Sequence, residues 1–252
     1  MHERTQTTAG SRGCCAKWRG HTASSRTIRP VTTSPDTTGR VREHFRKKAF
    51  SFDHLYDEEH ALQRLLRPGL FNRRELALEV ARGYDAPSVL DVGGGSGRIG
   101  ELMLEEGASR YVDVDLSDTM LGLARKRLAR FGDKVELVQG DFVEAPLTGP
   151  FDIVLALGYF DYIGDAERHV RRMRELCSGS AIASFPRWTW TKGPIRKLRY
   201  EVINNCPIFD YTADGLRRLF ADAGFEQVEL RGGKSGFLLR ATTSARETAG
   251  SP

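Results

Sequence analysis

The stretch Ser88-Val-Leu-Asp-Val-Gly-Gly-Gly-Ser-Gly97 decides the fold. Its first half is an apolar run that contains one carboxylate, and its second half is almost entirely glycine. The residues that follow carry apolar side chains at helical spacing, in Ile99, Leu102 and Met103. Glycines at such a junction permit a tight turn from strand to helix, and they let a ligand approach the backbone closely. The stretch therefore predicts a strand, a ligand-binding loop and a helix, in this order.

The alternation of strand and helix continues through the rest of the chain. Strands are expected at residues 88–92, 110–115, 135–138, 151–157, 180–185, 227–230 and 237–241. Apolar residues recur between them at spacings of three and four, as in Leu121, Ala124 and Leu128. This alternation predicts an α/β fold with a Rossmann-like, doubly wound sheet of seven strands. Residues 231–236 are too short for a crossover helix, so we expect a C-terminal hairpin that places one antiparallel strand in a mostly parallel sheet.

The chain upstream of this pattern changes character twice. Residues 1–38 are rich in Ser, Thr and Arg without apolar periodicity, so they cannot offset their ordering entropy by burial and are predicted to be a disordered tail. Residues 39–70 contain several aromatic side chains before a break at Pro68-Gly69, which favours a helical N-terminal cap. We expect one folded domain over residues 39–243 and a second disordered tail over 244–252.

The net charge of the chain is unevenly distributed. The formal charge of +5 comes from residues 1–40, where seven Lys and Arg face two acids, whereas residues 41–252 hold 31 basic and 31 acidic residues. A neutral body gives no general electrostatic reason to expect a nucleic-acid partner. The arginine-rich start also fits an organellar transit peptide, although a plain flexible tail is the favoured interpretation.

Composition limits the class of protein further. No apolar run approaches the roughly 20 residues that cross a bilayer, and the chain begins without a signal-peptide pattern. We therefore expect a soluble, cytoplasmic protein, with an organelle as the alternative. The four cysteines are too scattered for a disulfide framework or a zinc cluster, so no metal site is expected.

The glycines after the first strand follow a specific spacing. An acid, one other residue and then glycines at alternate positions occur as Asp91, Gly93, Gly95 and Gly97. This pattern resembles motif I of the class I S-adenosylmethionine-dependent methyltransferases. Gly94 stands where family members often carry cysteine or another small residue, and we treat it as equivalent to these. The resemblance implies that this loop, Gly94 included, holds S-adenosylmethionine.

The second strand and the helix after it match the same family. Residues 111–117, followed by Met120, resemble the family's second strand, whose terminal acid holds the ribose hydroxyls of the cofactor. By this resemblance the ribose acid is Asp115, with Asp113 as the fallback, and Leu116 and Met120 also contact the cofactor. A carboxylate suits this role because it accepts two hydrogen bonds from vicinal hydroxyls at once.

Two further segments resemble the adenine and methionine sites of the family. Asp141 after the third strand would accept a hydrogen bond from the exocyclic amine, and Phe142 would pack on the adenine ring. For Asp141 a helix or turn cap is the alternative. At the end of the fourth strand, Leu157, Gly158 and Tyr159 stand where family members flank the methionine moiety.

Catalytic residues are harder to predict than cofactor residues. Methyl transfer from a sulfonium is an in-line displacement, in which alignment and water exclusion supply much of the acceleration. We name Tyr159, Asp161 and His169 as catalytic candidates, the last two as general bases for a hydroxyl or carboxyl acceptor. The alternatives are a helix N-cap for Asp161 and a surface helix position for His169. No Asn/Asp-Pro-Pro-Tyr signature of amino-group methyltransferases occurs here, which favours an oxygen acceptor.

A basic and aromatic insertion follows the fifth strand. It spans residues 186–211 and includes Arg187, Trp188 and Tyr200. Aromatic faces and cations suit a planar or anionic small molecule, so we predict a lid over the acceptor, with Tyr56 of the cap as a fourth substrate contact. An amphipathic, solvated helix is the alternative. The insertion and its neighbourhood are similar to those of magnesium-protoporphyrin O-methyltransferases.

Three other functions stay open on the sequence alone. An NAD-binding oxidoreductase would share the ribose acid and the spacing of Gly95, Gly97 and Gly100, but Asp91 and the segment at Asp141 argue against it. A nucleic-acid methyltransferase would use the basic, aromatic insertion. A silent member of the family would bind the cofactor without turnover. We expect a small-molecule acceptor as the partner and no nucleic acid, and leave a homodimer open.

Overall fold

The computed structural model describes residues 39–40, 42–43, 68–186, 209, 211–233 and 236–243. The predictions for the two tails, for most of the helical cap and for most of the lid-like insertion lie outside these residues. Within the described part of the chain, no helix is long and apolar enough to cross a membrane.

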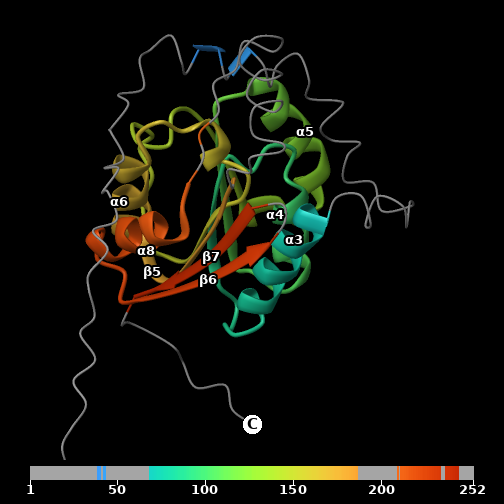
Figure 1. Cartoon of the computed structure of the whole chain (residues 1–252). Helices are drawn as coiled ribbons and strands as arrows, with labels where there is room; N and C mark the ends of the chain where they lie inside the picture. Colours follow the sequence, from blue (N-terminus) through green and yellow to red (C-terminus); the bar gives the residue numbers. More distant parts are fainter. Residues whose placement is uncertain are drawn as a thin grey trace, which may run out of the picture.

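The described residues form one mixed sheet of seven strands, in the order β3-β2-β1-β4-β5-β7-β6. The strands are β1 (Ser88–Val92), β2 (Arg110–Asp115), β3 (Val135–Gln139), β4 (Phe151–Ala156), β5 (Cys177–Phe185), β6 (Gln227–Gly233) and β7 (Gly236–Thr242). All neighbours are parallel except that β7 is antiparallel to both β5 and β6. The predicted α/β fold, with a mostly parallel, doubly wound sheet and one antiparallel C-terminal strand, is confirmed (Figure 1).

The C-terminal hairpin is longer than the sequence suggests. Residues 231–236 are expected to be a loop, but Arg231 pairs with Leu238 and Gly233 pairs with Gly236. The expected loop is therefore mostly strand, because backbone hydrogen bonds of the hairpin continue through residues without apolar alternation. The fifth strand also begins earlier than predicted, at Cys177, directly after the preceding helix.

Helices cover both faces of the sheet. They are α3 (Pro68–Ala81), α4 (Arg98–Glu105), α5 (Asp118–Leu128), α6 (Ala166–Leu176) and α8 (Ala213–Asp222), with short 3-10 helices η2 (Ala129–Lys134) and η3 (Phe160–Tyr162). The expected break at Pro68-Gly69 is instead the beginning of α3. Proline is tolerated in the first turn of a helix, where its missing N–H would have no intrahelical partner.

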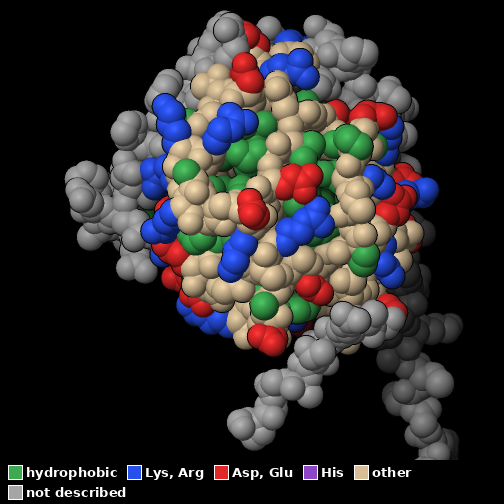
Figure 2. All heavy atoms as spheres, turned by 180° about the vertical axis from the view of Figure 1, so that it is seen from behind, with side chains coloured by type: hydrophobic (Ala, Val, Ile, Leu, Met, Phe, Trp, Pro, Cys, Tyr) green, Lys and Arg blue, Asp and Glu red, His purple; other side chains and the backbone are tan. Residues whose placement is uncertain are grey.

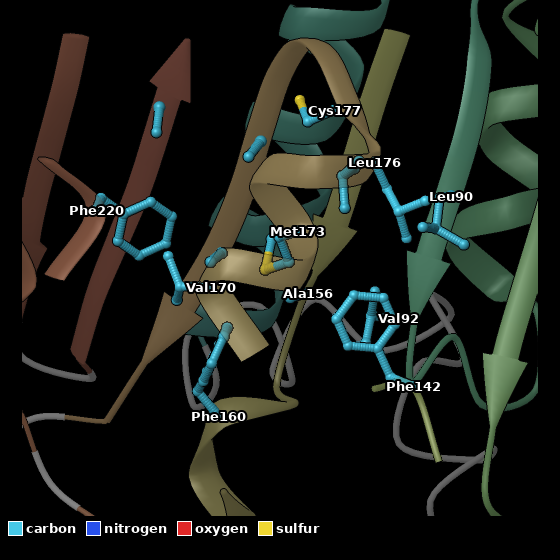
Figure 3. Packing of buried hydrophobic residues seen from close by; sticks show 14 of the residues in the cluster. Leu90, Val92, Phe142, Ala156, Phe160, Val170, Met173, Leu176, Cys177 and Phe220 are labelled. Atoms are coloured by element: carbon cyan, nitrogen blue, oxygen red, sulfur yellow. The ribbon is translucent and has the colours of Figure 1, made fainter. Parts of the chain in front are cut away.

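The two faces of the sheet carry separate hydrophobic cores. Leu90 and Val92 of β1 pack with residues of α6 and α8, whereas Val89 packs with residues of α3, α4 and α5. Figure 3 shows Val170, Met173 and other side chains of the first core between α6 and the sheet. Alternate residues of one strand thus point to opposite layers. As a result Asp91 lies on the same face as Val89, toward α3, α4 and α5.

Candidate functional site

The glycine-rich loop after β1 is held by the two acids of β2. The backbone N–H of Gly94 donates to Asp113 Oδ1 at 3.1 Å, and the N–H of Gly95 donates to Asp115 Oδ2 at 3.2 Å. Asp115 Oδ1 accepts a further hydrogen bond from the N–H of Ser117 at 2.7 Å. The end of β2 therefore fixes the conformation of the loop, which lies at the carboxyl edge of the parallel strands, where open α/β sheets bind ligands.

The glycines of this loop are required for different reasons. Gly93, Gly95 and Gly97 have φ values of +71°, +64° and +74°, a region that favours glycine. A Cβ on Gly97 would lie 3.0 Å from Leu128 Cδ1, so this glycine allows the loop to pack on α5. A Cβ on Gly95 would have Met120 Sδ, at 4.0 Å, as its nearest neighbour. Gly95 thus faces open space, which is the space that a ligand would use.

Gly94 is not equivalent to another small residue, contrary to the prediction. A Cβ at this position would lie 2.7 Å from both Cγ and Oδ1 of Asp113. Non-bonded carbon atoms do not approach so closely, so alanine or cysteine would displace the Asp113 carboxyl group. The sequence did not reveal this contact because Gly94 lies in the loop after β1, whereas Asp113 is on β2.

Asp91 and Asp113 lie beneath the loop, on neighbouring strands in the same register. Asp91 is 2% exposed and accepts a hydrogen bond from the Tyr111 hydroxyl at 2.8 Å, and Asp113 is fully buried. Burial raises the pKa of Asp91 to about 7, despite the hydrogen bond from Tyr111. Burial, and then the charge of Asp91, raise the pKa of Asp113 well above its ordinary value. Asp113 is therefore unsuited to the fallback role at the ribose.

Asp115 differs from Asp113 in being only half-buried. Burial raises the pKa of its carboxyl group to about 6, and hydrogen bonds from the backbone N–H groups of Ser117 and Gly95 oppose this rise. Leu116, also half-buried, follows it directly, and Met120 lies one turn into α5. Ser117 caps that helix, with its Oγ accepting from the Met120 N–H at 3.3 Å. The end of β2 thus presents a carboxylate beside the open side of Gly95.

Asp141 and Phe142 follow β3 and lie next to residues that follow β4. Asp141 Oδ1 accepts from the Val143 N–H at 2.9 Å, so the turn-cap alternative holds for this oxygen. Phe142 is buried, and its ring centroid lies 6.3 Å from that of Tyr159 in an edge arrangement. Tyr159 also contacts the loop, because a Cβ on Gly93 would lie 2.9 Å from Tyr159 Cδ2.

Tyr159 is therefore placed between the glycine-rich loop and the segment after β3. Burial raises the pKa of its hydroxyl well above the ordinary value, and the charges of Asp141 and Asp115 act in the same direction. The preceding residue, Gly158, has a φ of +84°, and its N–H donates to Ser184 Oγ at 2.7 Å. Leu157, just beyond the end of β4, is half-buried and packs with the core on the α3, α4 and α5 face.

His169 is buried, so the alternative of a surface helix position is wrong. It is 5% exposed, and its ring centroid lies 5.7 Å from that of Tyr159 and 6.3 Å from that of Phe142. Its Nδ1 is 2.7 Å from the carbonyl oxygen of Asp165. Because a carbonyl only accepts, we assign the proton of the neutral ring to Nδ1, which leaves a lone pair on Nε2. Burial lowers the pKa of His169, which favours this neutral form.

Asp161 lies in η3 and is not the N-cap of the following helix. The N-cap of α6 is Asp165, whose Oδ1 accepts from the Arg168 N–H at 3.3 Å. The carbonyl oxygen of Asp161 accepts from the Phe209 N–H at 3.1 Å, which joins this segment to the far end of the insertion. The alternative of a helix N-cap for Asp161 is therefore wrong.

Comparisons with known proteins agree with this geometry. A family model described as a methyltransferase domain matches residues 89–179, which include the loop and both segments after β3 and β4. The magnesium protoporphyrin IX methyltransferase of Synechocystis PCC 6803, solved with bound SAH, has a similar fold, with a TM-score of 0.67 and 20% identity. That similarity covers 83% of this chain and 100% of the Synechocystis chain. These comparisons support the resemblance to the class I S-adenosylmethionine-dependent methyltransferases.

Curated relatives of this chain are distant. An uncharacterized methyltransferase of Geobacillus sp. strain WCH70 is 31% identical over 145 residues, which are 56% of this chain and 58% of that relative. A malonyl-[acyl-carrier protein] O-methyltransferase of Geobacter sulfurreducens is 26% identical over 203 residues, 76% of this chain and 72% of that relative. The match to the Geobacillus relative thus spans less than two thirds of its length, and these relatives do not define an acceptor.

The described residues of this chain fit S-adenosylmethionine, the cofactor that the resemblance implies. The open side of Gly95 would accommodate a ligand against the backbone, whereas a side chain there would fill the same space. Each oxygen of Asp115 accepts one backbone N–H, and a carboxylate oxygen has a second lone pair for a ligand hydroxyl. No group of three or more metal-ligating side chains occurs among the described residues.

Two residues near this candidate site are absent from the sequence-based prediction. Ser184 on β5 is buried and holds Gly158 through its hydroxyl. Arg73 on α3 lies beside Gly158, with Nη1 3.0 Å from the position that a Cβ would take there. Neither residue has a local sequence signal, because their proximity depends on contacts between distant segments.

The predicted substrate-binding residues of this chain are not placed by the structure. Arg187, Trp188, Tyr200 and Tyr56 all lie outside the described residues. Their role at the acceptor therefore stays a prediction.

Proposed function

We propose that this chain transfers the methyl group of S-adenosylmethionine to an oxygen atom of a small-molecule acceptor. When bound, the cofactor supplies an electrophilic methyl group on a sulfonium. The observation that carries the proposal is the convergence, at one sheet edge, of the loop at Gly95, the carboxylate of Asp115 and the aromatic pair Phe142 and Tyr159.

The proposed cofactor contacts follow from this arrangement. Asp115 accepts hydrogen bonds from the two ribose hydroxyls with the lone pairs that the backbone leaves available. Asp141 uses one oxygen to cap its own turn and has the second for the adenine amine. Phe142 and Tyr159 provide aromatic surface near the ring, and Asp91 acts indirectly by fixing Tyr111 under the loop.

His169 is the proposed general base. Its Nδ1 is held by the Asp165 carbonyl, so Nε2 is the atom that would accept a proton from an acceptor hydroxyl. A lowered pKa keeps the imidazole neutral, and thus able to accept, at neutral pH. Tyr159, whose pKa is raised, stays protonated and would donate a hydrogen bond to the acceptor oxygen. Asp161 is the alternative base.

Two observations support an oxygen atom of a small molecule. Two curated relatives are named as O-methyltransferases, and the Asn/Asp-Pro-Pro-Tyr signature of amino-group methyltransferases does not follow β4, where Gly158-Tyr159-Phe160 stands instead. Acidic and basic side chains are interspersed on the face that Figure 2 shows, which does not favour a nucleic-acid backbone there. The aromatic and basic insertion, through Arg187, Trp188 and Tyr200 together with Tyr56, would hold a planar or anionic acceptor.

The test begins with binding and ends with turnover. Calorimetry of the full chain should show binding of S-adenosylmethionine and of SAH but not of NAD; binding of NAD alone would overturn the proposal. Metabolite extracts are then incubated with labelled S-adenosylmethionine and either the wild type or Gly95→Val, in which the side chain occupies the open side of the loop. A metabolite that gains one methylene in mass only with the wild type identifies the acceptor.

A further inference from the structure

Asp113 lies beneath the glycine-rich loop with one oxygen hydrogen-bonded and the other not. Its Oδ1 accepts from the Gly94 N–H at 3.1 Å. Its Oδ2 is buried and has no hydrogen-bond partner among the described residues. Burying a charged oxygen without a partner costs more free energy than burying a neutral one. The environment of Oδ2 therefore favours the neutral acid form of Asp113, with the proton on this oxygen.

Two acids and a phenol lie on the same face of the sheet as Asp113. Asp91 is its partner in the register of β1 and β2, so these two carboxyl groups are neighbours on that face. Tyr111 and Asp115 are two residues before and after Asp113 on β2, and therefore share the face. On the other neighbouring strand, β3, the register partner is the apolar Leu137. The charges of Asp91 and Asp115 both disfavour a further negative charge on Asp113.

The helices that cover this face do not offset that repulsion. Arg127 of α5 approaches the loop, but it donates to the Ser96 carbonyl and lies 3.7 Å from Glu101 of α4. Gly100 of α4 packs its backbone against the Tyr111 ring, and α3 contributes apolar residues to this core. A negative charge on Asp113 would therefore have no positive partner among the described residues.

Asp91 and Asp113 consequently hold one negative charge between them near neutral pH. The Tyr111 hydroxyl donates to Asp91 at 2.8 Å, which stabilises the charge on Asp91. Burial raises the pKa of Asp91 to about 7. Burial, and then the charge of Asp91, raise the pKa of Asp113 well above its ordinary value. At pH 8, Asp91 is thus mostly ionised, whereas Asp113 retains its proton.

The glycine-rich loop is what covers Asp113. A Cβ on Gly94 would lie 2.7 Å from Asp113 Cγ, so the backbone of the loop rests directly on the carboxyl group. The next residue, Gly95, faces the open space proposed for the cofactor and donates to Asp115 at 3.2 Å. If Asp113 released its proton to the solvent, the new charge would need hydration, and water reaches it when Gly94 moves away. The protonation of Asp113 and the conformation of the loop are therefore coupled.

We propose that Asp113 is a positioning residue that holds the glycine-rich loop in its binding conformation only while its carboxyl group carries a proton. Loss of this proton admits water beneath Gly94 and displaces Gly95 from the cofactor site. The sheet thus contains a pH-sensitive control of the loop, made of Asp91 and Asp113, that opens as the pH rises. This inference concerns the free chain, and it rests on the proposed function only where SAH is used as a probe.

The first arm of the test detects the proton by infrared spectroscopy of the free chain at pH 8. The difference spectrum of the wild type minus Asp113→Asn should contain the carbonyl band of a protonated carboxylic acid, which shifts when aspartate is labelled with ¹³C at its carboxyl carbon. The band should disappear as the pH is raised. Asp133→Asn is the matched control, because Asp133 is exposed, and it should keep the band. Absence of the band overturns the proposal.

The second arm follows the loop by hydrogen exchange of the peptide that contains Gly94 and Gly95, measured by mass spectrometry between pH 7 and pH 9. The ratio of exchange rates in the wild type and Asp113→Asn removes the intrinsic pH dependence of exchange. This ratio should rise about tenfold per pH unit once the pH exceeds the pKa of Asp113, because asparagine stays neutral. A constant ratio overturns the proposal. If Asp113→Asn does not fold, the infrared band and the exchange rate of the wild type, referred to Asp133→Asn and to exposed peptides of the same chain, must change over the same pH range.

The third arm measures the Kd for SAH by calorimetry over the same pH range. The wild type and Asp113→Asn should bind SAH within about twofold of each other at pH 7, and above the pKa of Asp113 the wild type should lose affinity by up to about tenfold per pH unit relative to the variant. Equal pH dependence in the two proteins overturns the role of Asp113 in positioning the loop. Failure of both to bind SAH at pH 7 overturns the proposed function instead, while the infrared and exchange results still decide whether Asp113 controls the loop.

Discussion

Replacing Asp115 by alanine tests the proposed cofactor site most directly. The change removes the acceptor for the N–H groups of Gly95, at 3.2 Å, and Ser117, at 2.7 Å, as well as the proposed partner of the ribose hydroxyls. One hydrogen bond to a charged group contributes about 1.5–3 kcal/mol, so the Kd for SAH should rise about tenfold to a hundredfold or more. Calorimetry at pH 7.5 with the wild type as reference measures this change.

Asp115→Asn is the matched control, because it keeps the shape and one acceptor oxygen but loses the charge. Burial raises the pKa of Asp115 to about 6 in the free protein, so its carboxylate is ionised above that pH and protonated below it. The affinity of the wild type for SAH should therefore fall as the pH decreases from 7 to 5, by up to about tenfold per pH unit below the pKa. In Asp115→Asn this dependence should be absent or much weaker.

Two results would refute the reasoning. An unchanged Kd in Asp115→Ala would move the ribose contact to another residue. An equal pH dependence in the wild type and in Asp115→Asn would assign the titration to another group, of which Asp91, with a pKa of about 7, is one described example.

Three further predictions test other parts of the site. Gly94→Ala should weaken SAH binding at least about tenfold, because its Cβ would displace Asp113 and with it the loop, whereas Gly122→Ala, in open space on α5, should leave binding unchanged. His169→Gln should lower kcat about a hundredfold or more with SAH affinity within twofold of the wild type, and equal losses in both would indicate a cofactor contact instead. Burial raises the pKa of Asp91 above its value in the unfolded chain, so the wild type should lose stability relative to Asp91→Asn as the pH rises from about 4 to 7. Melting temperatures of the two proteins that change equally with pH over this range would contradict this prediction.

The strands and the loop could be predicted because their signals are local. The residues of β1 and β2 agree with the expected ranges, since buried parallel strands form short apolar runs bounded by polar residues and glycines. The glycines at positions 93, 95 and 97 predicted a tight turn from the sequence alone. The positive φ values at these three positions agree with that prediction. Helical spacing of apolar residues placed α4, α5, α6 and α8 for the same reason.

The roles of individual acids could not be separated in this way. Asp113 and Asp115 are two residues apart on one strand and point to the same face, so periodicity treats them alike. Only the packing of Gly94 against Asp113 shows that Asp113 is buried beneath the loop and that Asp115 lies at the open side of the loop. The burial of His169 was missed for a similar reason, because one polar residue on a helix does not reveal which neighbours cover it.

The sequence by itself determined the class of fold, the glycine-rich loop and the resemblance to a family. The tertiary structure alone decided that β7 lies between β5 and β6, which buries Leu239 and Ala241, and that Arg73 reaches Gly158 from a helix far upstream. The physical reason is that backbone conformation and the face on which a side chain lies depend on nearby residues. Contacts between distant segments depend instead on how strands align and which helices cover them, and the packing of the whole domain determines both.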